Sequence, residues 1–178
     1  MNIEIISGSP RSQSLTHRVA VFLQKELASK TSHNIGLIDV REWKMPLLEN
    51  VIGTPDQAPD HLKPLANRMF AADAFVLVTP EYNGSYSAAL QNLIDHFPKQ
   101  SRKAFGLVTG SPGGLGGARA SQQLLLLVPA LFGIAAPNML LVPFLDQKFS
   151  PEGELTDAGF QKSVDTFTNE FLWLAEAL

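Results

Sequence analysis

A serine-rich loop near the N-terminus carries residue types that bind phosphate. Ser9, Arg11 and Ser14 lie between an apolar run that ends at Ser7 and a helical pattern that begins at Ser14. A helix N-terminus presents free N–H groups and the positive end of the helix dipole, which favours anions. The hydroxyls add donors and the guanidinium adds a charged donor fork. We expect a phosphate-binding loop, although an ordinary turn with Ser14 as N-cap would use the same residues.

A second polar loop, residues 80–85, could hold a planar heterocycle. Tyr82 offers a flat amphipathic ring, and Glu81 and Asn83 offer polar groups. Gly84 would let a ligand approach the backbone closely. An ordinary polar turn is an equally good interpretation of this loop taken alone.

A third loop, residues 110–117, holds five glycines in eight positions. Ordering so many glycines is entropically unfavourable, so we expect the loop to serve close backbone approach to a ligand or a neighbouring subunit. It is not a hydrolase nucleophile elbow, because G-x-S-x-G around Ser111 would need glycine where Thr109 stands.

Other kinds of chemistry find little support in the chain. It has no cysteine, which excludes disulfides, a thiol nucleophile and thiolate-bound metals. His17, His33, His61 and His96 show no metal-ligand spacing, so we expect structural histidines and no metal site. G-x-G-x-x-G after the first strand and the P-loop motif are both absent. No side chain is nominated as a catalytic acid, base or nucleophile.

The elements that must position these loops alternate strictly between strand and helix. Apolar runs without alternation, such as residues 74–79, are typical of strands buried on both faces of a parallel sheet. We therefore expect an α/β fold with five parallel strands in the order 2-1-3-4-5. The predicted strands are residues 3–6, 34–40, 74–79, 103–109 and 135–142, and the predicted helices are 14–29, 61–72, 87–97, 118–131 and 155–178, the last capped by Thr156.

In such a sheet, ligands bind beyond the carboxyl ends of the strands, near the switch between strands 1 and 3. The three loops follow strands 1, 3 and 4, so the fold would bring them to one edge. This convergence predicts one shared binding site.

The composition indicates one folded domain over residues 1–178. The chain is 45% hydrophobic and 17% charged, which excludes disorder, and its net charge of −3 predicts no nucleic-acid partner. Residues 122–145 carry no charge, but three prolines interrupt them, so we expect a helix, a loop and a buried strand and no membrane contact. The N-terminus lacks a signal pattern, so we expect a cytoplasmic protein. The helix before Leu131 is apolar almost all round; it is either deeply buried or contacts a partner subunit.

Four motifs run in order through the chain, and their members can be read directly. They are G-S-x-R-x-x-S at Gly8, Ser9, Arg11 and Ser14; P-E-Y-N at Pro80, Glu81, Tyr82 and Asn83; L-x-N-x-I-D at Leu90, Asn92, Ile94 and Asp95; and S-P-G-x-x-G-G-x-R-A at Ser111, Pro112, Gly113, Gly116, Gly117, Arg119 and Ala120. Together they resemble the NADPH-dependent FMN reductase family over nearly the whole chain. Gln91 and His96 depart from the lysine and tryptophan that members often carry there.

The resemblance implies a flavodoxin-like three-layer α/β/α domain with non-covalently bound FMN. It implies an enzyme that passes hydride from NADPH or NADH through FMN to a small-molecule acceptor: a quinone, an azo compound, a flavin or a metal ion. A flavodoxin-type electron carrier and a non-catalytic flavin-binding module are the alternatives. A homodimer or homotetramer is expected. The implied FMN-binding residues are Ser9, Arg11, Ser14 and Thr16 at the phosphate, Pro80, Glu81, Tyr82, Asn83 and Gly84 at the ring, and Ser111, Gly113 and Gly114 near its edge.

Overall fold

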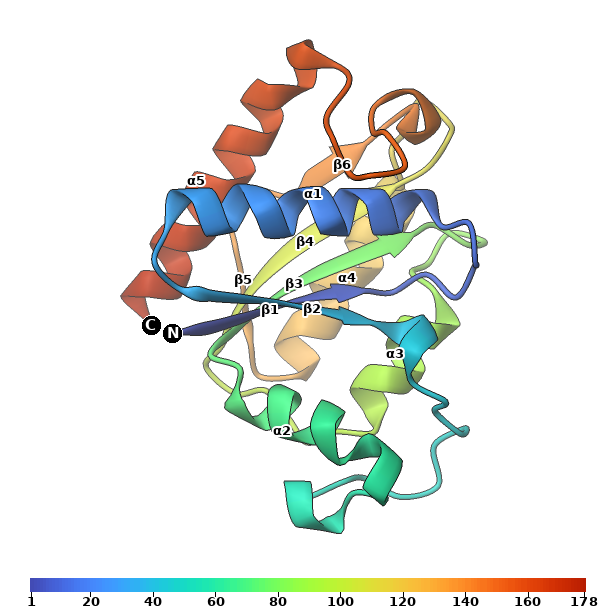
Figure 1. Ribbon diagram of the computed structural model, residues 1–178, viewed down its shortest axis with the longest axis vertical. Helices are drawn as coiled ribbons and strands as arrows, with labels where there is room; N and C mark the ends of the chain where they lie inside the picture. The colour runs from blue at the N-terminus through green and yellow to red at the C-terminus, as the bar shows by residue number, and fades with distance from the viewer.

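The computed structural model describes residues 1–178 and contains one parallel sheet between two layers of helices (Figure 1). The strand order is β2-β1-β3-β4-β5, and β6 also pairs with β4. The predicted flavodoxin-like α/β fold and strand order are therefore confirmed. The strands are β1 (Asn2–Ser7), β2 (Asn34–Asp39), β3 (Ala74–Pro80), β4 (Ala104–Gly110), β5 (Ile134–Ala135) and β6 (Leu140–Val142), and the helices are α1 (Leu15–Lys30), α2 (Lys63–Ala71), α3 (Ala88–Asp95), α4 (Ala118–Ala130) and α5 (Gln161–Ala177).

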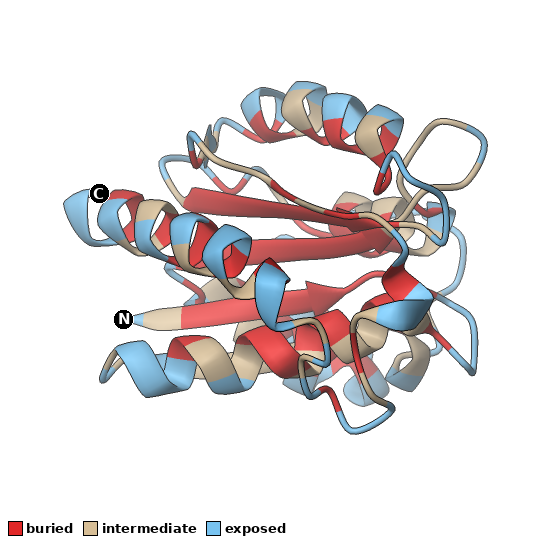
Figure 2. Cartoon of the chain, turned by 90° about the horizontal axis from the view of Figure 1, so that it is seen from above, coloured by how far each residue is buried: buried red, intermediate tan, exposed pale blue.

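The sheet separates two apolar cores, because successive strand residues point to opposite faces. Ile5 on β1 and Val76 on β3 pack toward α1 and α5. Ile6 and Leu77, their neighbours in sequence, pack toward α2, α3 and α4. Both faces of the central strands are covered, and the strands are buried along almost their whole length (Figure 2). This explains why they appear in the sequence as continuous apolar runs.

The fifth predicted strand, residues 135–142, is interrupted. Ala135 pairs with Phe105 on β4 and Leu140 pairs with Val108, so two extra residues are looped out of the strand between β5 and β6. Pro137 lies in this interval and has no N–H to donate to a ladder. The proline therefore accounts for two short strands in place of one.

Residues 122–145, the long uncharged stretch, form the end of α4 followed by β5 and β6. This agrees with the expected helix, loop and buried strand. None of the helices combines the length and the apolar character needed to cross a membrane.

The last helix begins later than predicted. A single 3-10 turn, Ala158–Phe160, comes first, and the Asp157 carboxylate caps it by accepting from the N–H of Gly159 at 3.0 Å. Thr156 is not an N-cap, because its hydroxyl donates to the carbonyl of Gln147 at 3.0 Å. The prediction of a helix from residue 155 was wrong because a long-range bond uses the capping hydroxyl elsewhere.

Candidate functional site

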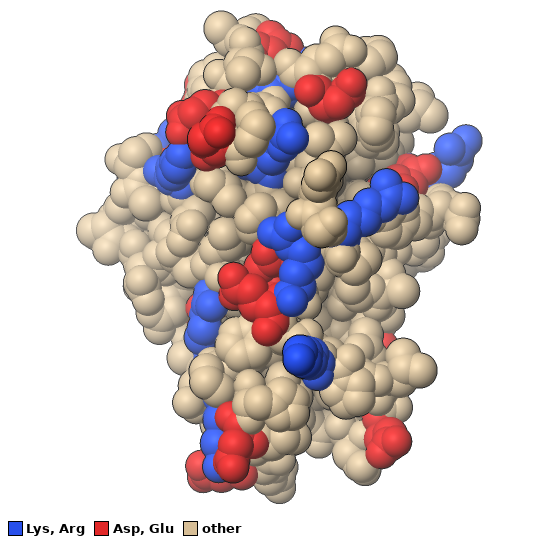
Figure 3. All heavy atoms as spheres, turned by 45° about the vertical axis from the view of Figure 1, so that its right-hand side comes forward, with Lys and Arg blue, Asp and Glu red and all other residues tan.

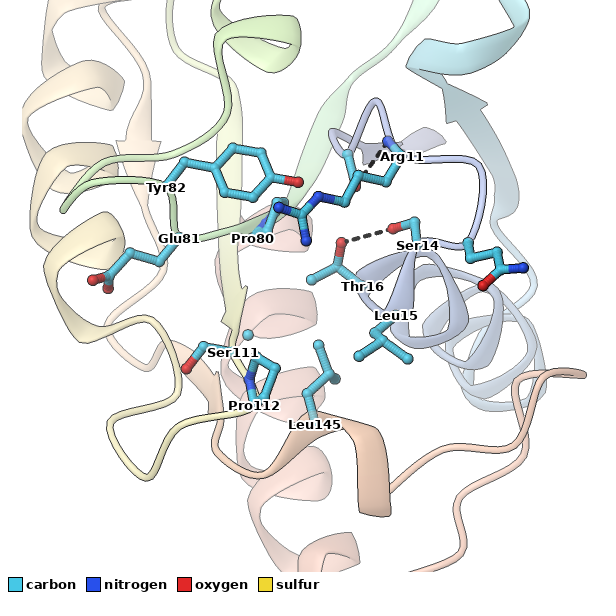
Figure 4. A pocket seen from close by; sticks show the side chains of 13 residues that line it. Arg11, Ser14, Leu15, Thr16, Pro80, Glu81, Tyr82, Ser111, Pro112 and Leu145 are labelled. Carbon is cyan, nitrogen blue, oxygen red and sulfur yellow. Dashed lines mark hydrogen bonds between the residues drawn. The ribbon is translucent and has the colours of Figure 1, made fainter.

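The three loops meet at the carboxyl edge of the sheet and enclose a cleft of about 210 Å³ (Figure 4). The cleft lies between the loops that follow β1, β3 and β4, at the topological switch point of the sheet. Its lining residues are Ser9, Arg11, Gln13, Ser14, Leu15, Thr16, Pro80, Glu81, Tyr82, Gly110, Ser111, Pro112 and Leu145.

Most of the residues predicted for the site lie in or beside this cleft. Asn83 and Gly84 line an adjoining hollow, which they share with Arg119 and with Glu81 and Ser111 of the cleft. Gly113 and Gly114 line neither space. They lie in the same loop, beside the Ser111 hydroxyl and the Phe144 ring respectively.

One end of the cleft is formed by buried hydroxyl groups at the start of α1. Ser9, Ser14 and Thr16 are almost fully buried, and the Ser14 and Thr16 hydroxyl oxygens lie 3.1 Å apart. The Ser14 hydroxyl also accepts from the N–H of His17 at 3.1 Å. Ser14 therefore caps the helix and lines the cleft at once, so the two interpretations of this loop are compatible.

Arg11 and Tyr82 face each other across the mouth of the cleft (Figure 4). The guanidinium carbon lies 4.9 Å from the centre of the tyrosine ring, within the range of a cation–π contact. The Tyr82 hydroxyl is buried and has no hydrogen-bond partner. A buried hydroxyl without a partner destabilises a protein by about 1–3 kcal/mol. Its position in the cleft therefore fits a bound group that would complete the hydrogen bond.

The Glu81 carboxylate already accepts hydrogen bonds from within the protein. It accepts from the N–H of Arg119 at 3.1 Å and of Ala120 at 3.4 Å, the second and third residues of α4. The N-cap residue of α4 is Gly117, which has no side chain to fill this role. Glu81 thus caps α4 from another loop, and its contribution to the cleft is limited to its backbone and the aliphatic part of its side chain.

A tight turn orients Tyr82. Tyr82 and Ser85 exchange two backbone hydrogen bonds, of 2.8 and 3.1 Å, across Asn83 and Gly84. Both central residues have positive φ, 51° and 82°. This is the pattern of a type I′ hairpin turn, for which Asn-Gly is the preferred sequence.

The glycine-rich loop contains glycines with different roles. Gly116 has φ of 59°, and a Cβ there would lie 2.8 Å from the backbone nitrogen of Pro143. Packing against the end of β6 therefore requires a glycine at this position. A Cβ on Gly113 would meet nothing closer than the Ser111 hydroxyl at 3.7 Å. The fold leaves room at Gly113, which makes it the better candidate for ligand approach.

Leu15 and Leu145 form an apolar wall that the sequence interpretation missed (Figure 4). Leu145 is 2% exposed and follows β6, the last strand to reach the same edge of the sheet. The rule that ligands lie beyond strand ends applies to this strand as well. Applied to residues 143–145, it would have found Leu145.

Charged side chains form neither a metal-binding cluster nor a patch of one sign on the face that Figure 3 shows. No three His, Asp or Glu side chains lie together in a way that could hold a metal. Figure 3 shows lysine and arginine side chains interspersed with aspartate and glutamate on one face of the molecule.

Comparisons with known proteins find both a matching family and a relative that is similar over most of the chain. Residues 1–145 match the NADPH-dependent FMN reductase family. The FMN-dependent NADPH-azoreductase of Staphylococcus aureus is 30% identical over 176 residues, which cover 94% of this chain and 92% of the relative.

Solved structures show the same fold. FerB, a flavoenzyme NAD(P)H:(acceptor) oxidoreductase from Paracoccus denitrificans, superposes with a TM-score of 0.77 at 24% identity over 99% of this chain and 97% of that one. A flavodoxin from Pseudomonas aeruginosa superposes with a TM-score of 0.58 at 20% identity over 97% of this chain and 99% of that one. The match over residues 1–145 and the curated relative extend the likeness beyond the fold: the chain belongs to the NADPH-dependent FMN reductase family.

Proposed function

We propose that this protein binds FMN in the cleft between its three loops and reduces a small-molecule acceptor with electrons from NAD(P)H. Family membership makes the chain an oxidoreductase that works with FMN and NADPH. The acceptor and the role of each residue are our proposal. The observation that carries it is the cleft itself, which is lined by buried hydroxyls at the start of α1 and by Tyr82, whose buried hydroxyl has no hydrogen-bond partner.

The residues at the start of α1 suit the phosphate. Ser9, Ser14 and Thr16 would donate hydroxyl hydrogen bonds, and Arg11 would add a charged contact. The N-terminal amides of α1 would complete the set, since a helix N-terminus favours a dianion.

The loops after β3 and β4 suit the ring. Pro80 and Tyr82 offer flat apolar surface, and Leu145 closes the opposite side. Because the Glu81 carboxylate is held at α4, we expect backbone N–H groups that make no hydrogen bond within the protein, those of residues 81, 83, 84, 113 and 114, to be the donors for the ring's polar edge. Bound FMN would take up hydride from NAD(P)H and supply electrons to the acceptor. The protein would bind and orient it, with no side chain assigned as general acid or base.

An azo compound or a quinone is the acceptor class we favour. A curated relative is named an azoreductase, and the adjoining hollow lined by Asn83, Gly84 and Arg119 leaves space beside the cleft. A reductase that draws on NAD(P)H would work in the cytoplasm, where that donor is regenerated.

We also propose that the protein works as a homodimer or homotetramer. Leu126 on α4 is 68% exposed, and Phe132 just beyond the helix is 64% exposed. Two large apolar side chains this exposed in and just after one helix are candidates for contact with a partner subunit. In sedimentation at micromolar concentration we expect a dimer or larger species, reduced to monomer by Leu126→Glu with Phe132→Glu. A wild-type monomer would contradict this part of the proposal.

The function is tested by a spectrum and an assay on the same sample. Purified protein is titrated with FMN, and NADPH is then added under nitrogen. We expect a shift in the flavin absorbance on binding, bleaching by NADPH, and recovery when methyl red or a benzoquinone is added. Bound flavin that NADPH does not bleach would indicate an electron carrier, and no shift with FMN would remove the cleft as a flavin site.

A further inference from the structure

Arg41 contacts the proposed phosphate loop but does not line the cleft. It follows β2 and is absent from the lining of the cleft. Its Nη1 atom donates to the carbonyl of Ser12 at 2.9 Å and to the carbonyl of Arg11 at 3.4 Å. Two consecutive carbonyls of the loop are therefore turned toward one guanidinium.

This contact fixes the direction of the loop's N–H groups. All peptide bonds in the chain are trans, so a carbonyl and the following N–H point in opposite directions. With the carbonyls of Arg11 and Ser12 held toward Arg41, the N–H groups of Ser12 and Gln13 point away from it. Anion-binding loops work by presenting N–H groups to the anion and turning carbonyl lone pairs elsewhere. Arg41 supplies a positively charged partner for those lone pairs.

Asp39 holds Arg41 in place. Both carboxylate oxygens accept from the Arg41 Nε atom at 2.9 Å, one of them also accepts from Nη2, and Oδ1 accepts from the Arg41 backbone N–H at 3.0 Å. These contacts leave Nη1 for the loop. Asp39 is 5% exposed and is the last residue of β2, opposite Ser7 on β1. The guanidinium is thus anchored to a buried carboxylate at the end of a strand of the sheet.

The same carboxylate approaches the first turn of α1. One Asp39 oxygen lies 3.4 Å from Nδ1 of His17, which also lies 3.0 Å from the Ser7 hydroxyl. His17 in turn donates its backbone N–H to the Ser14 hydroxyl in the cleft. Burial alone would raise the pKa of Asp39, but its hydrogen bonds and ion pair with Arg41 outweigh burial and hold that pKa below the ordinary value. The anchor therefore stays ionised at neutral pH.

We propose that Arg41, anchored by Asp39, is a positioning residue for the FMN phosphate: it orients the peptide groups of residues 11–13 without touching the ligand. The inference rests on the proposed phosphate site, and the experiment separates the two. The experiment also distinguishes a positioning role of Arg41 from a purely structural role. Only a positioning role would change the affinity for a flavin with a phosphate more than the affinity for one without it.

The readout is the ratio of FMN to riboflavin affinity, measured by quenching of flavin fluorescence. Riboflavin has the same ring but no phosphate. We expect the wild type to prefer FMN, and Arg41→Ala to lower that preference roughly tenfold, by analogy with the loss of at least tenfold that follows removal of a residue that orients a metal ligand. Arg41→Lys should lower it as well, because an ammonium lacks the fork needed to bind Asp39 and the loop at once. Arg41→Lys also serves as the second variant if the Arg41→Ala protein does not fold.

Arg68→Ala is a matched control. Arg68 pairs with Glu4 through two bonds, of 2.9 and 2.5 Å, and the exposed fractions of the two side chains, 32% and 9%, resemble the 25% and 7% of Arg41 and Asp39. We expect this variant to lose stability but to keep the wild-type FMN preference. An unchanged preference in both Arg41 variants would overturn the inference, as would an equal loss in Arg68→Ala. A wild type that binds FMN no better than riboflavin would instead overturn the phosphate site itself.

Discussion

Arg11 is the only basic side chain that lines the cleft, and its guanidinium lies over the Tyr82 ring instead of being paired with a carboxylate. Its charge is therefore available to an anion. We expect Arg11→Ala to weaken FMN binding by about 1.5–3 kcal/mol, the contribution of one charge-assisted hydrogen bond. Riboflavin affinity should change much less, and a titration of both ligands checks this. Unchanged FMN affinity would remove Arg11 from the site.

The Tyr82 hydroxyl gives a test in which the fold and the ligand respond in opposite directions. In the free protein this buried group has no partner, so Tyr82→Phe should leave the free energy of unfolding unchanged or raise it by up to about 1 kcal/mol. If a ligand completes the bond, the same change should weaken FMN binding by about 0.5–1.5 kcal/mol. Denaturant unfolding of the free protein and a flavin titration measure the two effects. A loss of stability with no effect on binding would show that the hydroxyl serves the fold.

At the scale of elements, the ends of the strands and helices hold the site together. The first turn of α1 is capped by Ser14, and that of α4 is capped by Glu81 from the loop after β3. Each cap satisfies N–H groups that a helix would otherwise leave without a partner. Both capping residues, Ser14 and Glu81, also line the cleft, Glu81 with the part of the residue before its carboxylate, so each cap helps to fix a residue of the cleft wall.

Two glycines of the glycine-rich loop have different roles, one in the packing of the fold and one in the approach of a ligand. A pair of substitutions separates these roles. Gly116→Ala places a Cβ 2.8 Å from a backbone atom at φ of 59°, so we expect it to destabilise the protein by at least about 1–2 kcal/mol. Gly113→Ala meets no such obstacle and should leave the free energy of unfolding within about 0.5 kcal/mol of the wild type.

The FMN affinity of the second variant then tests the role of the loop. We expect Gly113→Ala to weaken FMN binding several-fold while the melting temperature is kept, since the added methyl group affects only a closely approaching ligand. Full affinity in this variant would exclude Gly113 from the site.

At the scale of the whole molecule, His17 links stability to pH. Burial lowers the pKa of its imidazole from 6.5, and the nearby Asp39 carboxylate offsets this only in part. Between the lowered value and 6.5 the unfolded chain binds more protons than the folded one, so the free energy of unfolding decreases as pH falls through this window. Asp39, whose own pKa is lowered, contributes its pH dependence only below about 4, close to the ordinary value for aspartate.

We therefore expect the wild type to lose stability when the pH falls from 7 to 5.5, and His17→Asn to lose less. Asparagine keeps a polar atom near the Ser7 hydroxyl but does not titrate. Urea unfolding at several pH values checks the slope, with His61→Asn, at an exposed position, as the control. Parallel slopes in the wild type and His17→Asn would contradict this assignment.

Features that depend on residues close together in the sequence could be predicted, whereas features that depend on distant contacts could not. The Asn83-Gly84 turn and the Ser14 cap depend on neighbours within a few residues, and both could be read from residue type. The break between β5 and β6 is also local, since Pro137 lies within the predicted strand 135–142 and the prediction did not allow for it. The late start of α5 depends on the contact of Thr156 with Gln147, which residue type does not reveal.

The sequence by itself determined the parallel sheet, the strand order and the meeting of three loops at one edge. Apolar runs and loop chemistry are local, and general rules of connection in α/β proteins then place the loops. Only the tertiary structure decided that Glu81 caps α4, that Leu145 closes the cleft and that Arg41 holds the phosphate loop from behind. These contacts join residues about 30 to 130 positions apart, so they depend on how helices and strands pack, which no local pattern specifies.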